Sequence, residues 1–198
     1  MPVKFNPKIH HRKSIRLPGY DYSQAGAYFV TIVTWQRECL FGEVVDGEMR
    51  LNKAGQIVQW EWENLAQAFK FVKLGIDQVM PNHFHGIIVI NDNMSDRARA
   101  TCPYRKFGKP RSGELPTIIR LFKSSVSRQI DNNSQDIMSP VWQRNYYEHV
   151  IRDEESLNRI REYIINNPLR WGLDKENPER ESEDEFDKWI ASFKNKPH

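Results

Sequence analysis

The chain has 198 residues, of which 39% are hydrophobic and 12% aromatic. This length predicts one domain with appended segments, and the aromatic content excludes a disordered protein. Its two cysteines, Cys39 and Cys102, exclude a disulfide framework and a zinc finger built from cysteines. The apolar stretches are too short for a membrane span, and the first residues lack the apolar core of a secretory signal. We therefore expect a cytoplasmic protein.

The net charge of +3 conceals a strong asymmetry along the chain. Residues 173–198 contain eight acidic and five basic residues, a net charge of −3, so the rest of the chain carries +6. Residues 1–20 contain five basic residues and no acidic one, and residues 97–128 contain nine basic residues and one acidic one. Two basic segments and an acidic tail favour a nucleic-acid-binding protein, although an ordinary solvated surface remains the alternative.

The first third of the chain predicts an arm, a strand, a hairpin and a helix. Residues 1–26 are rich in proline, glycine and basic residues and predict an arm. Residues 27–35 are dense in β-branched and aromatic side chains, which favour a strand, and an Asp-Gly pair within 41–51 is typical of a hairpin turn. Asn52 is the expected N-cap of a helix. The apolar stripe of that helix is Val58, Trp62, Leu65 and Phe69.

The middle of the chain predicts two more strands, a loop and a helix. Residues 74–80 and 84–90 read as strands joined by a short turn. Residues 91–114 are basic and lack periodicity, which predicts a long loop. Pro116 suits the first turn of a helix, and residues 141–151 predict a further strand. The expected buried face of the helix is Ile119, Phe122, Val126 and Ile130.

The last third predicts one long helix and a tail. Asp153 is the expected N-cap of a helix that ends before Pro168. Helices and hairpins without regular βαβ alternation predict an α+β fold with an antiparallel sheet. We expect a basic arm (1–26), one domain (27–172) and an acidic tail (173–198). The tail contains one short amphipathic segment, marked by Phe186, Trp189, Ile190 and Phe193.

Two of the six histidines have a spacing that suggests a site. His83 and His85 are two residues apart in a predicted strand, so both imidazoles lie on one face, while Phe84 points to the other. Two neutral imidazoles side by side are a natural half-site for a divalent metal. On this triplet alone, a solvated strand face is the more common explanation.

A second pair of polar residues lies at the end of the last predicted helix. Tyr163 and Asn167 are four residues apart and share a helix face, and Pro168 exposes Asn167 at the final turn. Tyr163 could act as a nucleophile, and Asn167 could supply an oxygen ligand to a metal. The alternative is a tyrosine at the edge of the core and an asparagine that caps the helix.

Several longer motifs occur in a characteristic order between about Arg12 and Gly172. Together they resemble the REP-associated tyrosine transposases, a branch of the single-tyrosine transposases of the HUH nuclease superfamily. The loop 91–114 and the residues after Gly172 are not covered. The matching residues are Gly19-Tyr-Asp-Tyr22, Tyr28-Phe-Val-Thr-Ile-Val-Thr34, Met80-Pro-Asn-His-Phe-His-Gly-Ile87, Phe122-Lys-Ser124 and the stretch from Tyr147 to Gly172, which includes Ile151-Arg-Asp-Glu154 and Tyr163-Ile-Ile-Asn-Asn-Pro168.

The resemblance implies a role for each residue of the two pairs. His83 and His85 would be the histidine pair of the superfamily, Tyr163 the nucleophile and Asn167 the third metal ligand. It also implies that the histidines lie on an antiparallel sheet against which the Tyr163 helix packs. The family points to Mg²⁺ or Mn²⁺ as the cofactor, whereas the softness of imidazole favours Zn²⁺ or Mn²⁺. The identity of the ion therefore remains open.

The resemblance further implies an activity on single-stranded DNA near hairpin-forming palindromic repeats. Attack by Tyr163 would give a 5′-phosphotyrosine and a free 3′-hydroxyl. Apart from the resemblance, we expect a monomer or a homodimer. Basic side chains of the arm, the loop and the central helix would bind DNA phosphates. The expected DNA-binding residues are Arg12, Lys13, Arg16, Arg105, Lys106, Lys109, Arg111, Arg120 and Lys123.

Two rival functions remain possible from the sequence. One is a non-catalytic repressor that binds nucleic acid with the same fold, and the other is a histidine-metal RNA hydrolase that needs no tyrosine. Tyr146 and Tyr147 precede the helix and are poorer nucleophiles than Tyr163, and His149 is expected to be structural. The acidic tail could compete with DNA for the basic surface or could simply cover part of the core.

Overall fold

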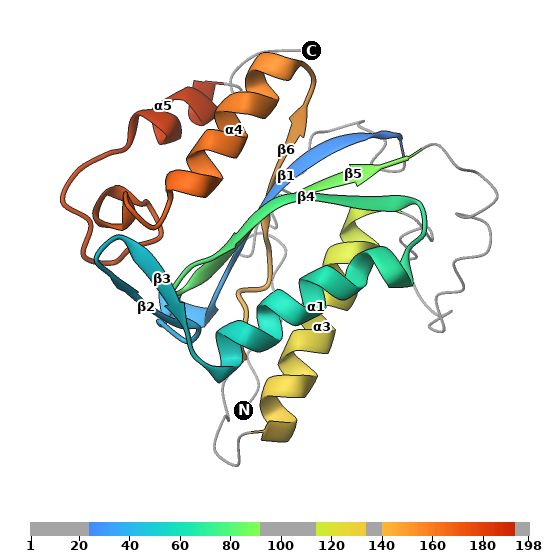
Figure 1. Ribbon diagram of the computed structural model, residues 1–198, viewed down its shortest axis with the longest axis horizontal. Helices are drawn as coiled ribbons and strands as arrows, with labels where there is room; N and C mark the ends of the chain where they lie inside the picture. Colours follow the sequence, from blue (N-terminus) through green and yellow to red (C-terminus); the bar gives the residue numbers. More distant parts are fainter. Residues whose placement is uncertain (1–23, 92–113, 134–139, 193–198) are drawn as a thin grey trace, which may run out of the picture.

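The computed structural model describes residues 24–91, 114–133 and 140–192, and its centre is a four-stranded antiparallel sheet (Figure 1). The strand order is β4–β5–β1–β6, so strands distant in sequence lie side by side. This arrangement confirms the predicted α+β class with an antiparallel sheet. The four strands are Gly26–Val33 (β1), Val72–Val79 (β4), His83–Ile90 (β5) and Tyr147–Ile151 (β6).

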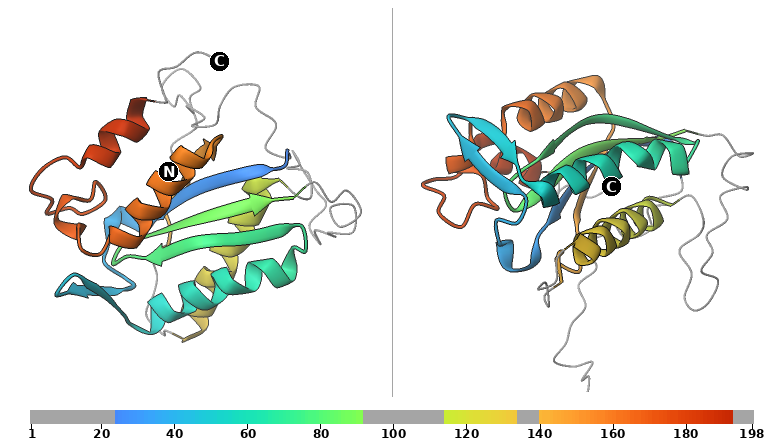
Figure 2. Two further views of the ribbon diagram at one scale, coloured as in Figure 1. Left: turned by 45° about the horizontal axis from the view of Figure 1, so that its top comes forward. Right: turned by 60° about the horizontal axis from the view of Figure 1, so that its bottom comes forward.

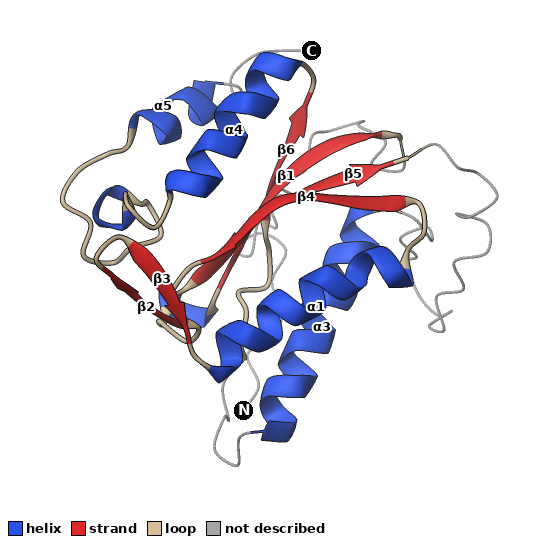
Figure 3. Cartoon of the chain, in the orientation of Figure 1, coloured by secondary structure: helices blue, strands red, loops and turns tan. Residues whose placement is uncertain are grey.

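Helices cover both faces of the sheet (Figure 2). Two of them, α1 (Lys53–Ala68) and α3 (Leu115–Asn133), pack on one face. The other face is covered by α4 (Glu154–Asn166) and α5 (Glu185–Ser192). The remaining elements, seen in Figure 3, are the hairpin β2–β3 (Gly42–Val45 and Glu48–Leu51) and the 3-10 turns η1 (Trp35–Arg37) and η2 (Trp171–Leu173).

Successive side chains of the central strands point to opposite faces of the sheet, so the interior consists of two hydrophobic clusters, one on each face. Phe84 of β5 faces α1 and α3, where its ring contacts those of Trp62 and Phe122 at ring-centroid distances of 4.5 and 5.5 Å. Phe29 and Ile87 point to the opposite face and pack under α4 and α5. Burying each large side chain of this kind contributes about 2 kcal/mol. The sheet is therefore held from both sides, and neighbouring residues of β5 belong to different clusters.

Local signals in the sequence account for the ends of several elements. The side chain of Asn52 accepts a hydrogen bond from the Gly55 amide at 3.0 Å, and that of Asp153 accepts one from Ser156 at 2.7 Å. Both predicted N-caps are thus confirmed. The turn between β2 and β3 has positive φ at Asp46 (53°) and at Gly47 (77°), as a two-residue hairpin turn requires.

The strand predicted over 141–151 is shorter than expected. Only Tyr147–Ile151 pairs along β1, and the preceding residues make a single bridge, from Trp142 to Thr34. The reason is a bulge: Tyr147 lies opposite Thr31 and Trp142 opposite Thr34, so this segment contains two more residues between the two contacts than β1 does. The carbonyls of residues 143–145 instead accept hydrogen bonds from the Lys123 ammonium.

Most of the predicted arm (1–26) and of the predicted loop (91–114) lies outside the described residues. Among the helices that the structure describes, none is both long enough and apolar enough to cross a membrane.

Candidate active site

His83 and His85 lie side by side on the face of β5 that is covered by α4. β5 pairs with β1, so that His83 is opposite Val33 and His85 opposite Thr31. Both histidine side chains are fully buried, and their Nε2 atoms are 2.9 Å apart. The predicted placement of both imidazoles on one face of a strand is confirmed.

Hydrogen bonds to the other ring nitrogens fix how the two imidazoles are oriented. The buried Asn82 amide donates to the carbonyls of Arg37 (3.1 Å) and Glu176 (2.7 Å), which leaves its Oδ1 to accept from His83 Nδ1 at 2.9 Å. His83 therefore carries its proton on Nδ1 and keeps a lone pair on Nε2. Thr31 Oγ1 lies 2.9 Å from His85 Nδ1 and orients the second ring in the same way.

Tyr163 projects from α4 onto the histidine pair. Its hydroxyl lies 3.3 Å from His85 Nε2 and donates to Asp174 Oδ2 at 3.0 Å. The ring is stacked on Phe186 of α5, with centroids 3.7 Å apart, and is only 4% exposed. Burial, reinforced by the negative charge of Asp174, raises the pKa of Tyr163 well above its usual value.

Asp174 completes the cluster, and sequence reasoning missed it. Its Oδ2 lies 3.7 Å from His83 Nε2 and 3.9 Å from His85 Nε2, and its Oδ1 accepts from the Glu176 amide at 2.7 Å. His83, His85 and Asp174 therefore form a group that could bind a metal ion. In the sequence, Asp174 is only the first of eight acidic residues in the tail. The turn η2, which returns the chain to the histidines, has no clear signature in the sequence.

Asn167 places a buried amide beside Asp174. It follows α4 directly, with φ −59° and ψ −41°, and its Nδ2 donates to Asp174 at 2.8 Å. Its Oδ1 is buried and has no hydrogen-bond partner among the residues that the structure describes. Such an oxygen can serve as a metal ligand, so the predicted role of Asn167 stays a prediction with a suitable geometry.

The electrostatics of the cluster keep the histidines neutral. Burial lowers the pKa of His83 to about 3 and also lowers the pKa of His85. Burial opposes ionisation of Asp174, but its contacts with His83, His85 and Asn167 outweigh burial and hold its pKa below the usual value. At neutral pH the cluster therefore presents imidazole lone pairs and a carboxylate, a donor set suited to a divalent cation.

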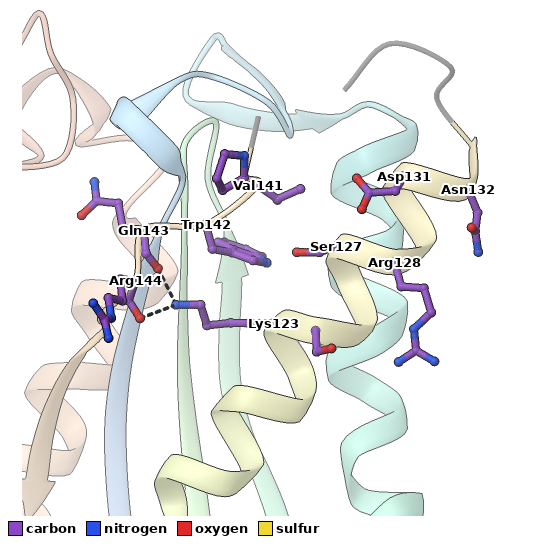
Figure 4. A pocket seen from close by; sticks show the side chains of 11 residues that line it. Lys123, Ser127, Arg128, Asp131, Asn132, Val141, Trp142, Gln143 and Arg144 are labelled. Atoms are coloured by element: carbon purple, nitrogen blue, oxygen red, sulfur yellow. Dashed lines mark hydrogen bonds between the residues drawn. The ribbon is translucent and has the colours of Figure 1, made fainter. Parts of the chain in front are cut away.

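Of the nine predicted DNA-binding residues, only Arg120 and Lys123 lie among the described residues, both on α3. Lys123 is on the opposite face of the sheet from the histidines and lines a pocket of about 610 Å³ (Figure 4). Its ammonium donates to the carbonyls of Gln143 at 2.5 Å and Arg144 at 3.2 Å. Burial lowers the pKa of Lys123 to about 8. A role of Lys123 in binding DNA remains a prediction.

Two other residues considered in the sequence lie on β6. The ring of Tyr147 packs against Phe29, with centroids 6.3 Å apart, and carries the Lys175 ammonium over its face at 4.9 Å. The ring of His149 lies 6.3 Å from that of Trp189 in α5. These contacts fit the structural role expected for His149.

Known proteins resemble this chain in sequence and in fold. No family model matches it. An uncharacterized protein of Haemophilus influenzae is 43% identical over 178 residues, which cover 88% of this chain and 98% of that protein. A second protein of Haemophilus influenzae, provisionally named a REP-associated tyrosine transposase, is 26% identical over 152 residues, covering 77% of this chain and 75% of the relative.

A solved structure shares the fold. It is a REP-associated tyrosine transposase bound to a REP hairpin, and it superposes with a TM-score of 0.55 at 17% sequence identity. The match covers 81% of this chain and 76% of the other.

Proposed function

We propose that this chain is a REP-associated tyrosine transposase, like the relative and the solved structure that it resembles, and that it cleaves and rejoins single-stranded DNA beside hairpin-forming palindromic repeats. The observation that carries the proposal is the position of the Tyr163 hydroxyl, within hydrogen-bonding distance of both His85 and Asp174. One buried cluster thus contains a nucleophile, candidate cation ligands and a proton acceptor, the groups that metal-assisted phosphodiester cleavage needs.

The donor set fits a divalent cation, for which we propose Mg²⁺ or Mn²⁺. The Nε2 atoms of His83 and His85 are 2.9 Å apart, which lets them share one N–H···N hydrogen bond and, when both are deprotonated, bind the same cation. His83, His85 and Asp174 would hold the ion, and the unpartnered Oδ1 of Asn167 can join them or replace Asp174. Bound there, the cation supplies the positive charge that neutralises a non-bridging phosphate oxygen.

The residues of the chain account for the movement of protons and electrons. The Tyr163 oxygen attacks phosphorus, and its proton passes to the carboxylate of Asp174, whose Oδ2 already accepts from the hydroxyl at 3.0 Å. The bond from phosphorus to the 3′ oxygen breaks and its electron pair stays on that oxygen, which takes up a proton from Asp174 or from water, giving a 5′-phosphotyrosine and a free 3′-hydroxyl. One phosphodiester replaces another, so the step needs no ATP and can run backwards to rejoin a strand.

The DNA partner follows from charge and from the neighbouring fold. The neighbour was solved with a REP hairpin, and this chain carries basic segments at 1–20 and 97–128 that suit a phosphate backbone. We therefore propose hairpin DNA with a single-stranded flank as the substrate, bound by a monomer or a homodimer.

A second candidate is a DNA-binding repressor with the same fold and no cleavage. The observation in its favour is that Tyr163 is only 4% exposed, with Phe186 stacked on its ring. Phe186 of α5 covers one face of the Tyr163 ring, so a protein in which α5 never moves and the site stays closed would bind DNA without cutting it.

The test is a cleavage assay with a REP hairpin that carries a single-stranded flank, in Mn²⁺. DNA labelled at its 3′ end should migrate with the protein on a denaturing gel, and DNA labelled at its 5′ end should give a shorter fragment that a polymerase can extend. Tyr163→Phe should abolish the adduct, whereas the matched variant Tyr147→Phe should keep it. Hairpin binding without an adduct in the wild type would favour the repressor.

The metal is tested on the same samples. His83→Ala and His85→Ala should each lose Mn²⁺ binding measured by calorimetry as well as cleavage, and Asn167→Ala should lose less because water can replace an amide oxygen. Cleavage that persists after complete removal of metal by a chelator would contradict the metal site.

A further inference from the structure

Arg37 lies at the edge of the histidine pair and is tied to it through its backbone. It is the last residue of η1, which follows β1. The carbonyl of Arg37 accepts from Asn82 Nδ2 at 3.1 Å, and Asn82 Oδ1 binds the Nδ1–H of His83 at 2.9 Å. One buried amide therefore holds both a candidate metal ligand and the backbone of Arg37 in place.

The backbone at this position is strained. Gln36 and Arg37 have φ values of 55° and 59°, in the left-handed region that residues with a side chain rarely adopt. Two such residues in succession persist only where the surrounding contacts impose them, and strain of this kind is concentrated at functional sites. The Arg37 side chain extends from this turn to Glu176, two residues after Asp174.

The partner of the Arg37 guanidinium is a carboxylate from the acidic tail. Arg37 Nε donates to Glu176 Oε2 at 3.0 Å, while the Glu176 amide donates to Asp174 Oδ1 at 2.7 Å. The Arg37 side chain is 49% exposed and that of Glu176 only 10%. The bond uses Nε, so the terminal nitrogens of the half-exposed fork remain available as donors, and a guanidinium fork matches two oxygens of a phosphate.

We propose that Arg37 binds a phosphate of the DNA strand that Tyr163 attacks, and that Glu176 occupies Arg37 here in place of that phosphate. The inference rests on the proposed function, because it needs a DNA strand at Tyr163. Arg37 sits beside the cluster on the same side as Asp174, so a strand whose scissile phosphate reaches Tyr163 passes the guanidinium with a neighbouring phosphate. Glu176 must then leave Arg37 before the strand is fully bound.

A purely structural role makes a different prediction. If Arg37 only fastens the tail, removing either member of the Arg37–Glu176 pair releases the same contact, and both changes shift DNA affinity in the same direction. If Arg37 binds phosphate, Arg37→Ala weakens DNA binding and Glu176→Gln strengthens it. The signs of the two effects separate the two roles.

The experiment measures binding of the full chain to the hairpin with a single-stranded flank, by fluorescence anisotropy over a range of salt concentrations. Arg37→Ala should weaken binding about tenfold or more, and Arg37→Lys should weaken it less. Glu176→Gln should tighten binding about three- to tenfold, and the double variant should match Arg37→Ala. The slope of log K against log salt should fall by about one when Arg37 is lost. Arg161→Ala, which breaks an exposed pair with Glu154, is the matched control and should stay within about twofold.

Effects of the same sign for Arg37→Ala and Glu176→Gln, or an unchanged salt slope, would overturn the proposal. Because Glu176→Gln leaves the strained turn intact, its result stands even if Arg37→Ala unfolds, which thermal melting detects. If the wild type forms the Tyr163 adduct while the Arg37 variants bind normally, this inference fails and the proposed function stands. Absence of both DNA binding and adduct in the wild type overturns both.

Discussion

Removing the Phe186 ring should loosen the cover over Tyr163. Phe186 is 5% exposed; it stacks on Tyr163 at 3.7 Å and 9° between ring planes, and lies edge-on to Phe29 at 6.1 Å. Truncation of a buried phenylalanine costs about 3–5 kcal/mol. The short helix α5 can settle into the gap, so we expect the lower end, a fall of about 3 kcal/mol in the free energy of unfolding. At the same time Tyr163 should become more accessible.

Urea unfolding measures the first effect, and the rate of adduct formation on hairpin DNA measures the second. Phe186→Ala should be less stable and, at temperatures where it is folded, faster. Trp60→Ala is the control, because the side chain of Trp60 is 55% exposed and its loss should change stability by no more than about 0.5 kcal/mol. A loss of stability below about 1 kcal/mol for Phe186→Ala, with an unchanged rate, would refute the view that this ring covers the nucleophile.

Two other perturbations test separate features. A chain stopped after Gly172 loses a segment of net charge −3, so it should bind hairpin DNA about three- to tenfold more tightly at low salt and less so at high salt. Its cleavage of the same DNA should fall because Asp174 is lost, and an increase in cleavage parallel to the increase in binding would argue against the role of Asp174. Gly86→Ala would bring a Cβ within 2.4 Å of the Trp62 ring, so urea unfolding should show that the free energy of unfolding falls by about 1–3 kcal/mol. Gly172→Ala is the control, because the space around Gly172 is open and the free energy of unfolding should not change.

Local patterns predicted most of the elements. The apolar stripe of Val58, Trp62 and Leu65 is buried as expected, and the caps at Asn52 and Asp153 form the predicted hydrogen bonds. These features depend on residues a few positions apart, which a sequence displays directly. The shared strand face of the two histidines is predictable for the same reason.

Contacts between distant segments were not predictable in the same way. Nothing near Asp174 in the sequence distinguishes it from the other acids of the tail, because its role depends on η2 bringing it back to α4 and β5. The Lys123 ammonium binds carbonyls of residues 143–145, a contact that no spacing in the sequence indicates, while its predicted role in binding DNA stays a prediction. Both outcomes depend on tertiary packing that no local spacing encodes.

The strand order also determines when the site can assemble during synthesis. β1, β4 and β5 are made first and can pair as a three-stranded sheet, but β6, which covers the outer edge of β1, is made about 60 residues after β5. A chain arrested before Tyr147 therefore exposes the hydrogen-bonding edge of β1 and the apolar face around Phe29. Ribosome pausing in that interval should promote aggregation of nascent chains, and the proposed nuclease activity should appear only after the segment containing Asp174 has emerged.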